Sequence, residues 1–476
     1  MDYNSLLQNY QGTIYDLDLR FSADKTKLQS LIEEDFELLE AAGVRKLQRV
    51  ALVVNSSFQF IVHYFALIKM RAIPVLMSKF STEYELEKCD EQYGIHWILT
   101  DNFALEKIVS FEADKIHTIS FNNNIYKCNL ICVNRDAPLF TSLEGMILQP
   151  TSGSTGEVKF CVRDEYGCLA EPINHMETTG FKNGHIFCPL PLNHAYGFGT
   201  AFLLAFVTSS DLTLLNEFNP KKVLRVFEEY NINMFTGTSA VYDIIRKMKI
   251  DDPNILPEYL VSAGAPLAED VALEYFERFH RIIYPSYGST ETGEMCLERE
   301  PIISPKGSTG TPLRQTKLRI EAVNETCGQI WVKNPSIMVG YLKRDGSIEN
   351  SLITEDGYFP TGDLGYFNEN GRLILNGRLK RMINVFGIKV NPTEVEEALF
   401  EIKGINDAYV YAGKHRSGSD VVVAEVVCDL ELTELEIIRE CKKRLTTQKV
   451  PSKIFKVDKI PRNSSGKIIL SELIQV

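Results

Sequence analysis

The sequence lacks the features that would place a protein in a membrane or on nucleic acid. Its most apolar run, residues 195–208, covers only about 14 residues, which is too short to span a bilayer and predicts a buried helix instead. The first residues carry neither the basic nor the apolar region of a signal peptide. A net charge of −12 argues against nucleic acid and anionic membrane surfaces as partners. We therefore expect no transmembrane segment, no nucleic-acid partner and a cytoplasmic location.

The ten cysteines lack the spacing of a metal site. Only Cys128 and Cys132 are close in sequence, and neither a second pair nor a suitably spaced histidine completes a zinc site. Dispersed free thiols are typical of a reducing compartment. Contents of 44% hydrophobic and 24% charged residues are those of an ordinary globular protein, and 476 residues predict two or more domains.

Strands alternate with helices through the first two thirds of the chain. This alternation predicts an α/β fold with a doubly wound parallel sheet covered by helices on both faces. The predicted strands are 50–54, 73–76, 97–100, 186–188, 211–215 and 259–262, and the predicted helices are 26–41, 57–69, 82–92, 221–230 and 239–248.

The pattern of predicted secondary structure changes after about residue 300. Short strands with glycine turns, such as 318–320 and 328–332, indicate a β-rich subdomain. Near residue 380 a compact α+β segment begins, and Asn391-Pro392-Thr393-Glu394 has the composition of a helix start. Further strands at 407–412, 421–428 and 453–457 and a helix at 432–445 complete it. We therefore predict a large N-terminal domain, residues 1–379, and a small C-terminal domain, residues 380–476.

One stretch, Thr151-Ser152-Gly153-Ser154-Thr155-Gly156-Glu157-Val158-Lys159, combines two glycines, four hydroxyl groups and a lysine. It follows an apolar strand, residues 146–148, which we expect to end at Gln149-Pro150. Glycines allow a tight turn that points backbone N–H groups at one centre, and this donor set suits a polyphosphate. It is not a Walker A loop, because no lysine follows Gly156 directly. The alternative is an ordinary solvated turn.

Four further motifs follow, each of which alone is compatible with an ordinary turn. They are residues 262–267 (SAGAPL), 287–291 (YGSTE), 357–365 (GYFPTGDLG) and 461–467 (PRNSSGK). In this order the five motifs resemble those of the adenylate-forming superfamily of acyl-CoA synthetases, aryl-acid and amino-acid adenylation enzymes and luciferases. The resemblance covers the chain from about residue 50 to its end, and it implies a mobile C-terminal domain.

The resemblance implies an ATP and Mg²⁺ site. The phosphate loop would hold the β- and γ-phosphates, Thr290 would bind the α-phosphate, and Glu291 would hold Mg²⁺. Asp363 and Arg378 would bind the ribose, since a fixed carboxylate accepts two O–H bonds. The residues implied in nucleotide binding are Thr151, Ser152, Gly153, Ser154, Thr155, Gly156, Lys159, Gly264, Ala265 and Pro266 beside the adenine, Tyr287 stacked on it, Gly288, Thr290, Asp363 and Arg378.

Three residues receive catalytic roles from the resemblance. Lys467 would bridge the attacking carboxylate and the α-phosphate, and a solvated tail lysine is the alternative. Lys380 would be the hinge between two domain arrangements. His194 would gate the acid site, although an isolated histidine after a strand is more often structural. Gly387 would lie beside the tunnel for the pantetheine thiol.

The expected acid site has five lining residues: His194, Tyr196, Gly237, Gly288 and Gly293. Amino-acid adenylation enzymes carry an aspartate where this chain has Ala195, so an α-amino acid is disfavoured. No charges are expected in this region, which favours an apolar acyl or aryl acid. We expect Gly197 and Gly199 to leave room for a ring or an alkyl chain.

Two departures concern the thioester step. Ligases of the coumarate type have lysines where this chain has Asn384 and Phe386, which puts contacts during that step in doubt. The resemblance implies activation of a carboxylic acid with ATP, then transfer to the thiol of CoA. Alternatives are loading of an acyl carrier protein, a luciferase-like oxygenase and a non-catalytic nucleotide sensor. Either a monomer or a homodimer is expected.

Overall fold

A computed structural model describes residues 2–101, 119–122, 125–152, 158–300, 307–323, 327–385, 388–414, 420–429, 431–462, 468–469 and 472–474. Contacts divide the chain into two units. Unit 1 comprises Met1–Leu318, Val332–Phe359 and Gly371–Leu373, and unit 2 comprises Arg319–Trp331, Pro360–Asn370 and Ile374–Val476. The predicted boundary at residue 380 stays a prediction.

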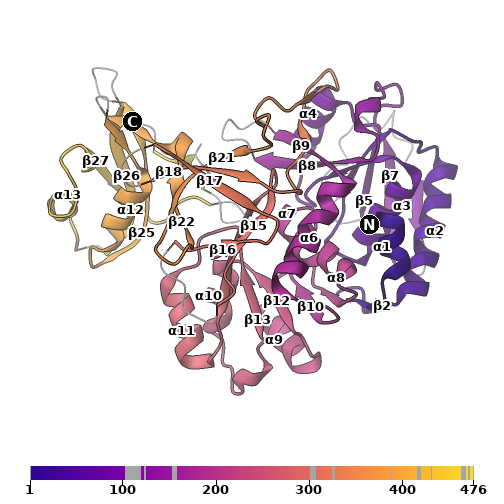
Figure 1. Ribbon diagram of the computed structural model, residues 1–476, viewed down its shortest axis with the longest axis horizontal. Coiled ribbons are helices and arrows are strands. Elements are labelled where there is room, and N and C mark those ends of the chain that lie inside the picture. The colour runs from indigo at the N-terminus through magenta and orange to yellow at the C-terminus, as the bar shows by residue number, and fades with distance from the viewer. Residues whose placement is uncertain are drawn as a thin grey trace. The chain divides into compact units, whose positions relative to one another are not determined.

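Unit 1 is built on two nine-stranded sheets (Figure 1). The first contains β1 (Ile14–Asp16), β2 (Phe21–Ala23), β10 (His185–Cys188), β11 (Asp211–Leu214), β12 (Met234–Gly237), β13 (Tyr259–Ser262), β14 (Ile283–Ser289), β15 (Gly293–Leu297) and β16 (Thr311–Pro312). Its order is β16-β15-β14-β13-β12-β10-β11-β1-β2. The strands from β14 to β1 run parallel, and antiparallel strands extend both edges.

The second sheet contains β3 (Arg49–Val53), β4 (Ile73–Leu76), β5 (Trp97–Asp101), β6 (Ile119–Asn122), β7 (Lys127–Cys132), β8 (Met146–Ser152), β9 (Val158–Asp164), β19 (Gly340–Leu342) and β20 (Ile348–Glu349). Its order is β20-β19-β9-β8-β4-β3-β5-β7-β6. Only β8, β4, β3 and β5 are parallel to one another. The prediction of parallel sheets therefore holds for the core of each sheet, whereas antiparallel strands form the edges.

Helices cover both faces of these sheets. They are α1 (Tyr3–Asn9), α2 (Lys25–Ala42), α3 (Phe58–Met70), α4 (Glu83–Tyr93), α6 (Glu165–Thr179), α7 (Ala195–Gly197), the π-helical η2 (Phe198–Leu203), α8 (Leu204–Val207), α9 (Pro220–Glu229), α10 (Ser239–Arg246) and α11 (Glu269–Phe279), with 3₁₀ turns η1 (Thr141–Leu143) and η3 (Pro253–Ile255). One apolar core joins α3, α6 and η2 to strands of both sheets, and a separate core packs α9, α10 and α11 on the other face of the first sheet (Figure 1).

The buried helix predicted at 195–208 is present, in three segments with π-helical geometry in the middle. Its residues are almost all inaccessible, which explains why apolar side chains surround the whole helix. In the part of the chain that the structure describes, no helix is long and apolar enough to cross a membrane.

Unit 2 contains a four-stranded sheet and a small α+β segment. The sheet has the order β17 (Lys317–Ala322), β18 (Gly328–Lys333), β21 (Phe359–Phe367) and β22 (Leu373–Arg378). After the 3₁₀ turn η4 (Leu379–Arg381), the segment contains β23 (Ile383–Val385), β24 (Ile388–Val390), α12 (Pro392–Phe400), β25 (Ile405–Lys414), β26 (Asp420–Cys428), α13 (Glu434–Lys442) and β27 (Lys453–Lys456). As predicted, Asn391 caps α12, and its side chain accepts a hydrogen bond from the Thr393 N–H.

Candidate active site

The described ends of the predicted phosphate loop lie on two antiparallel strands, β8 and β9. The strand does not end at Gln149-Pro150 as expected, because β9 pairs with it as far as Ser152, with Thr151 opposite Lys159. Gly153, Ser154, Thr155 and Gly156 lie outside the described residues. Lys159 is exposed, and its Nζ lies 5.6 Å from the ring centroid of Tyr341.

Tyr341 connects this hairpin to the predicted metal ligand. Its hydroxyl donates a 2.8 Å hydrogen bond to Oε1 of Glu291. Burial and the Glu291 charge raise the pKa of Tyr341 above its usual range, so the phenol stays a donor. The Met338 N–H donates to the Glu291 carbonyl at 2.8 Å and holds the backbone of the same turn. Lys159, Tyr341 and Glu291 therefore form one polar group, of which sequence reasoning found the first and the last.

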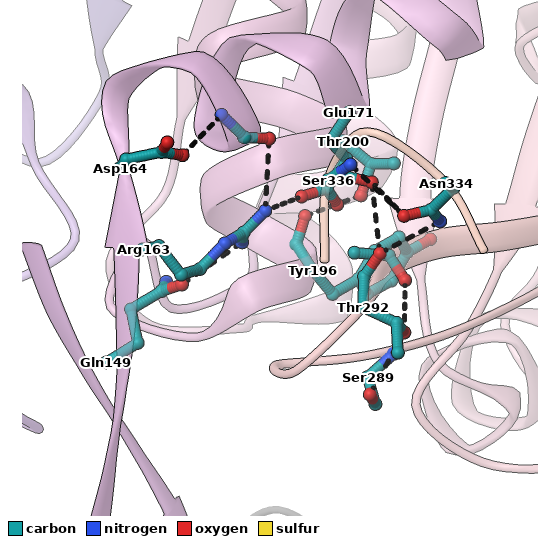
Figure 2. A network of polar contacts seen from close by, with 12 residues as sticks. Gln149, Arg163, Asp164, Glu171, Tyr196, Thr200, Ser289, Thr292, Asn334 and Ser336 are labelled. Atoms are coloured by element: carbon teal, nitrogen blue, oxygen red, sulfur yellow. Dashed lines mark hydrogen bonds and ion pairs between the residues drawn. The ribbon is translucent and has the colours of Figure 1, made fainter. Parts of the chain in front are cut away.

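A hydrogen-bond network fixes the turn that carries Thr290 and Glu291 (Figure 2). The hydroxyl groups of Ser289 and Thr292 lie 3.0 Å apart at its base. Asn334 Nδ2 and Ser336 Oγ donate to the Thr292 carbonyl at 3.1 and 3.0 Å. Because β15 then turns back along β14, this network presents Thr290 and Glu291, both half-buried, at the end of the hairpin.

The remaining candidates of unit 1 follow the carboxyl ends of adjacent parallel strands. Gly237 ends β12, the exposed turn 264–266 follows β13, and Tyr287 and Gly288 lie near the end of β14. Ligands of open α/β sheets bind at this edge. Gly264 has a φ of 82°, a left-handed conformation that glycine adopts without strain. The glycine therefore allows the tight turn at residues 264–266. Tyr287 is only 7% exposed.

The predicted acid gate begins the helix after β10. His194 is exposed and precedes α7 directly. The Tyr196 hydroxyl donates to the Val261 carbonyl of β13 at 2.8 Å, and burial raises its pKa well above the usual range. Tyr196 is therefore a neutral side chain that fixes the start of the helix against the sheet.

The expectation that Gly197 and Gly199 leave room for the acid is wrong. A Cβ at Gly197 would lie 2.4 Å from the Pro191 carbonyl oxygen, and one at Gly199 would lie 2.3 Å from Oε1 of Glu171. Both glycines therefore serve close packing. The region does contain a charged side chain, because the carboxylate of Glu171 also lies against Gly293, but this carboxylate is paired with Arg163 and the pair carries no net charge.

Glu171 forms a buried ion pair with Arg163 that sequence reasoning missed (Figure 2). Arg163 Nη2 donates to Oε2 of Glu171 at 2.9 Å, and Nη1 donates to Oε1 of Gln149 at 3.2 Å. The sequence offers one indication of this pair, because Arg163 directly follows an apolar run and could therefore be buried. The local sequence does not indicate which acidic residue would pair with it. Gly167, in the first turn of α6, contributes its carbonyl at 3.5 Å.

Unit 2 brings together the two residues predicted to bind the ribose. Arg378 Nε donates to Oδ1 of Asp363 at 2.8 Å, and the carboxylate is largely buried while the arginine is exposed. Thr361 donates to the Ile330 carbonyl at 2.9 Å, which fixes the strand next to Asp363. Lys380 is exposed within η4. Gly387 and Lys467, like Phe386, lie outside the described residues.

These residues fit ATP and Mg²⁺. Among the described residues no group of three or more histidine, cysteine or acidic side chains is placed to hold a metal ion. Mg²⁺ does not need such a cage, because it is commonly held by one or two carboxylates, water and substrate phosphates. Glu291, oriented by Tyr341 and 2.8 Å from its hydroxyl, supplies one such carboxylate.

Comparison with known proteins identifies the family of this chain. The family model described as AMP-binding enzyme matches residues 37–342, and that described as AMP-binding enzyme C-terminal domain matches residues 394–467. The 4-coumarate–CoA ligase 3 of Oryza sativa subsp. japonica is 26% identical over 464 residues, which cover 91% of this chain and 84% of that protein. The 2-succinylbenzoate–CoA ligase of Bacillus licheniformis is 30% identical over 358 residues, covering 71% and 73% of the two chains.

The fold is also similar to that of solved structures. The O-succinylbenzoate coenzyme A synthetase of Bacillus subtilis, in complex with AMP, superposes with a TM-score of 0.81 at 21% identity. The similarity covers 99% of this chain and 98% of that one. The resemblance inferred from the motifs is thereby confirmed, as is an α/β fold with a large N-terminal and a separate C-terminal domain. Since the first family model alone covers residues 37–342, well over half of the chain, this protein belongs to the AMP-binding enzyme family.

Proposed function

We propose that the protein is an AMP-forming acid–thiol ligase that activates an apolar acyl or aryl carboxylic acid with ATP and transfers it to the thiol of CoA. The observation that carries this proposal is the group formed by Lys159, Tyr341 and Glu291, which joins the hairpin with a phosphate-loop sequence to the carboxylate predicted to hold Mg²⁺. The relatives that support it are named as CoA ligases.

In the first half-reaction the carboxylate of the acid attacks the α-phosphorus of ATP, and pyrophosphate leaves. Lys159 and the hairpin tip hold the β- and γ-phosphates, Thr290 contacts the α-phosphate, and Asp363 with Arg378 binds the ribose. Mg²⁺ on Glu291 would neutralise phosphate charge. Lys467 approaches both anions, and a cation aimed at the developing charge typically accelerates such a step by about 10²–10³.

In the second half-reaction the thiol attacks the acyl carbonyl, and AMP leaves. AMP is a good leaving group, so no enzyme nucleophile is needed. We propose that the C-terminal domain rotates about Lys380 between the two steps, so that one site serves two transition states. Asn384 and Gly387 would then lie near the thiol, and the lack of lysines at positions 384 and 386 separates this chain from the coumarate-type ligases in that step.

Two measurements test the proposal. Wild-type protein with a panel of acids should exchange pyrophosphate into ATP in an acid-dependent manner, and adding CoA should yield thioester and AMP. Exchange without thioester formation, restored by a phosphopantetheinylated carrier protein, would favour the carrier-loading alternative. No acid-dependent exchange with any acid would reject ligase activity.

Lys467→Ala separates the half-reactions. The variant should lose pyrophosphate exchange, because the two anions meet without the bridging cation, yet still convert chemically synthesised acyl-adenylate to thioester. A matched control is Lys459→Ala, which removes a nearby lysine outside the motif. Equal loss of both half-reactions in Lys467→Ala would contradict its assigned role.

A further inference from the structure

The ion pair between Arg163 and Glu171 is closed off from solvent. Both residues are at most 3% exposed, and the guanidinium also contacts Gln149 (Figure 2). Arg163 lies on β9 and Glu171 on α6, so the pair ties the phosphate hairpin to the helix that covers the first sheet. Removing one partner of a buried ion pair leaves the other charge uncompensated and destabilises the protein, whereas replacing both partners by apolar residues can be neutral. We therefore expect Arg163 and Glu171 to stay in contact in the folded protein.

The carboxylate of Glu171 fills the space between two glycines from distant segments. A Cβ at Gly199 of η2 would lie 2.3 Å from its Oε1, and one at Gly293 of β15 would lie 2.8 Å from its Oε2. Side-chain carbons are not found this close to other atoms, so neither position accepts a larger residue while Glu171 stays in place. The volume that the two glycines leave is thus occupied by a carboxylate.

A second buried pair follows one helical turn further along α6. His175 Nδ1 lies 2.6 Å from Oε2 of Glu294, and the Ser286 hydroxyl donates to Oε1 of the same carboxylate at 2.6 Å. Residues 171 and 175 share one face of the helix. Beyond them, toward the amino ends of the strands, is a cavity of about 100 Å³ lined by His175, Thr178, Met234, Val261 and Tyr284.

Glu171 therefore lies against Gly293, one of the residues expected to line the acid site, and against Gly199 of the helix that follows His194 and Tyr196. We propose that Glu171, held by Arg163, is the far wall of the acid site and restricts the enzyme to compact acids. This inference rests on the proposed function. A longer chain would have to displace a paired buried carboxylate, which costs more than the burial of one or two further methylene groups returns.

The test is the dependence of acid activation on chain length. Pyrophosphate exchange is measured with straight-chain acids from acetate to palmitate and with benzoate, and kcat/KM is compared with chain length. The wild type should show a break beyond which longer acids are rejected. In the double variant Arg163→Leu/Glu171→Ala no charge is left unpaired, and the first rejected acid should gain about tenfold, the factor that burying two methylene groups provides.

Three further variants separate the effect of side-chain size at position 171 from effects on folding. Glu171→Asp retains the charge pair and removes one methylene, so it should move the break by about one carbon even if the double variant does not fold. Glu171→Gln retains the size and should keep the wild-type break. Glu177→Ala, which removes an exposed carboxylate from the same helix, is the matched control.

The outcomes separate the two proposals. Acid-dependent exchange with the same length profile in the wild type, Glu171→Asp and the double variant would overturn the role of Glu171 and leave the ligase intact. Wild-type protein without exchange on any acid would reject the proposed function itself. The expected result is a break that moves in Glu171→Asp and in the double variant and stays in place in Glu171→Gln and Glu177→Ala.

Discussion

At the scale of single residues, the position of Glu291 depends on one phenol. Tyr341 donates the 2.8 Å hydrogen bond to its carboxylate and lies beneath the ammonium of Lys159. Hydrogen bonds to charged groups contribute about 1.5–3 kcal/mol. The phenol therefore holds the predicted metal ligand in one orientation while the ring stays in contact with Lys159, the predicted phosphate-binding lysine.

Tyr341→Phe should raise the Mg²⁺ concentration needed for half-maximal pyrophosphate exchange by about tenfold, because an unrestrained carboxylate binds the ion less well. The ring remains, so the affinity for the acid should not change. Magnesium titrations of wild type and variant measure the effect, with the Tm of each protein as a control for folding. An unchanged magnesium dependence would contradict the role of Tyr341.

A second buried cluster gives a pH dependence to stability. His63 on α3 lies 2.7 Å from Oδ2 of Asp35 on α2, its other nitrogen contacts Gln59, and Cys128 on β7 lies beside it. Burial opposes the charge of the ring, but Asp35 and Cys128 raise the pKa of His63 to about 10. The free imidazole titrates near 6.5. The folded state therefore keeps a proton that the unfolded chain releases.

The free energy of unfolding should therefore decrease as pH rises, because deprotonation removes the favourable contact between the charged ring and Asp35. The stabilisation is fully present below pH of about 6.5 and is lost as pH rises through about 10, with a slope of at most about 1.4 kcal/mol per pH unit. Urea unfolding between these pH values should show a falling free energy of unfolding. Asp35→Asn should flatten the slope, because the amide no longer favours the charged ring. Equal slopes in both proteins would refute the assignment.

At the scale of elements, local sequence patterns predicted most of the helices and strands. The start of α12 was predictable because capping depends on residues that are adjacent in sequence, Asn391 and Pro392. The extension of β8 to Ser152 was not, because pairing with β9 supplies its hydrogen bonds. The ion pair of Arg163 and Glu171 was not predictable either, because only the fold brings together these residues of β9 and α6.

The proposed hinge element η4 lies between residues that contact one another. Arg381, its last residue, donates from Nη2 to Glu396 at 2.6 Å and to the Val410 carbonyl at 3.0 Å. Asn391 donates to the Asn376 carbonyl at 2.7 Å, and this bond joins residues on opposite sides of Lys380. Rotation about Lys380 would keep the Arg381 contacts and break that of Asn391.

Lys380→Pro should therefore separate the half-reactions. Proline fixes φ near −65° and suits at most one of two backbone states. We expect pyrophosphate exchange to continue, acyl-AMP to accumulate and thioester formation to stop. Lys380→Ala, which removes the side chain and leaves the backbone free, should form thioester at a rate near that of the wild type. Single-turnover kinetics measure each step, and unimpaired thioester formation in Lys380→Pro would place the pivot elsewhere.

At the scale of the whole molecule, the C-terminal segment has a core of its own. Among the described residues, its cluster of buried apolar side chains runs from Ile383 to Ile454 and includes none from the four-stranded sheet. The division by contacts nevertheless groups that sheet, through Arg319–Trp331 and Pro360–Asn370, with the C-terminal segment. If the apolar core from Ile383 to Ile454 is enough for folding, the domain begins near residue 380. If the four-stranded sheet is also needed, the domain begins before β17.

A fragment of residues 380–476 decides between these two possibilities. If the core from Ile383 to Ile454 is sufficient, as we expect, the fragment should fold alone and unfold cooperatively in urea, because a segment of about 100 residues can bury enough apolar surface. Circular dichroism and dispersed amide resonances measure this. Val410→Asp, which places a charge at a fully buried position of β25, should abolish the transition and serves as the control. A fragment without a cooperative transition would move the boundary before β17, since the four-stranded sheet would then belong to the folding unit.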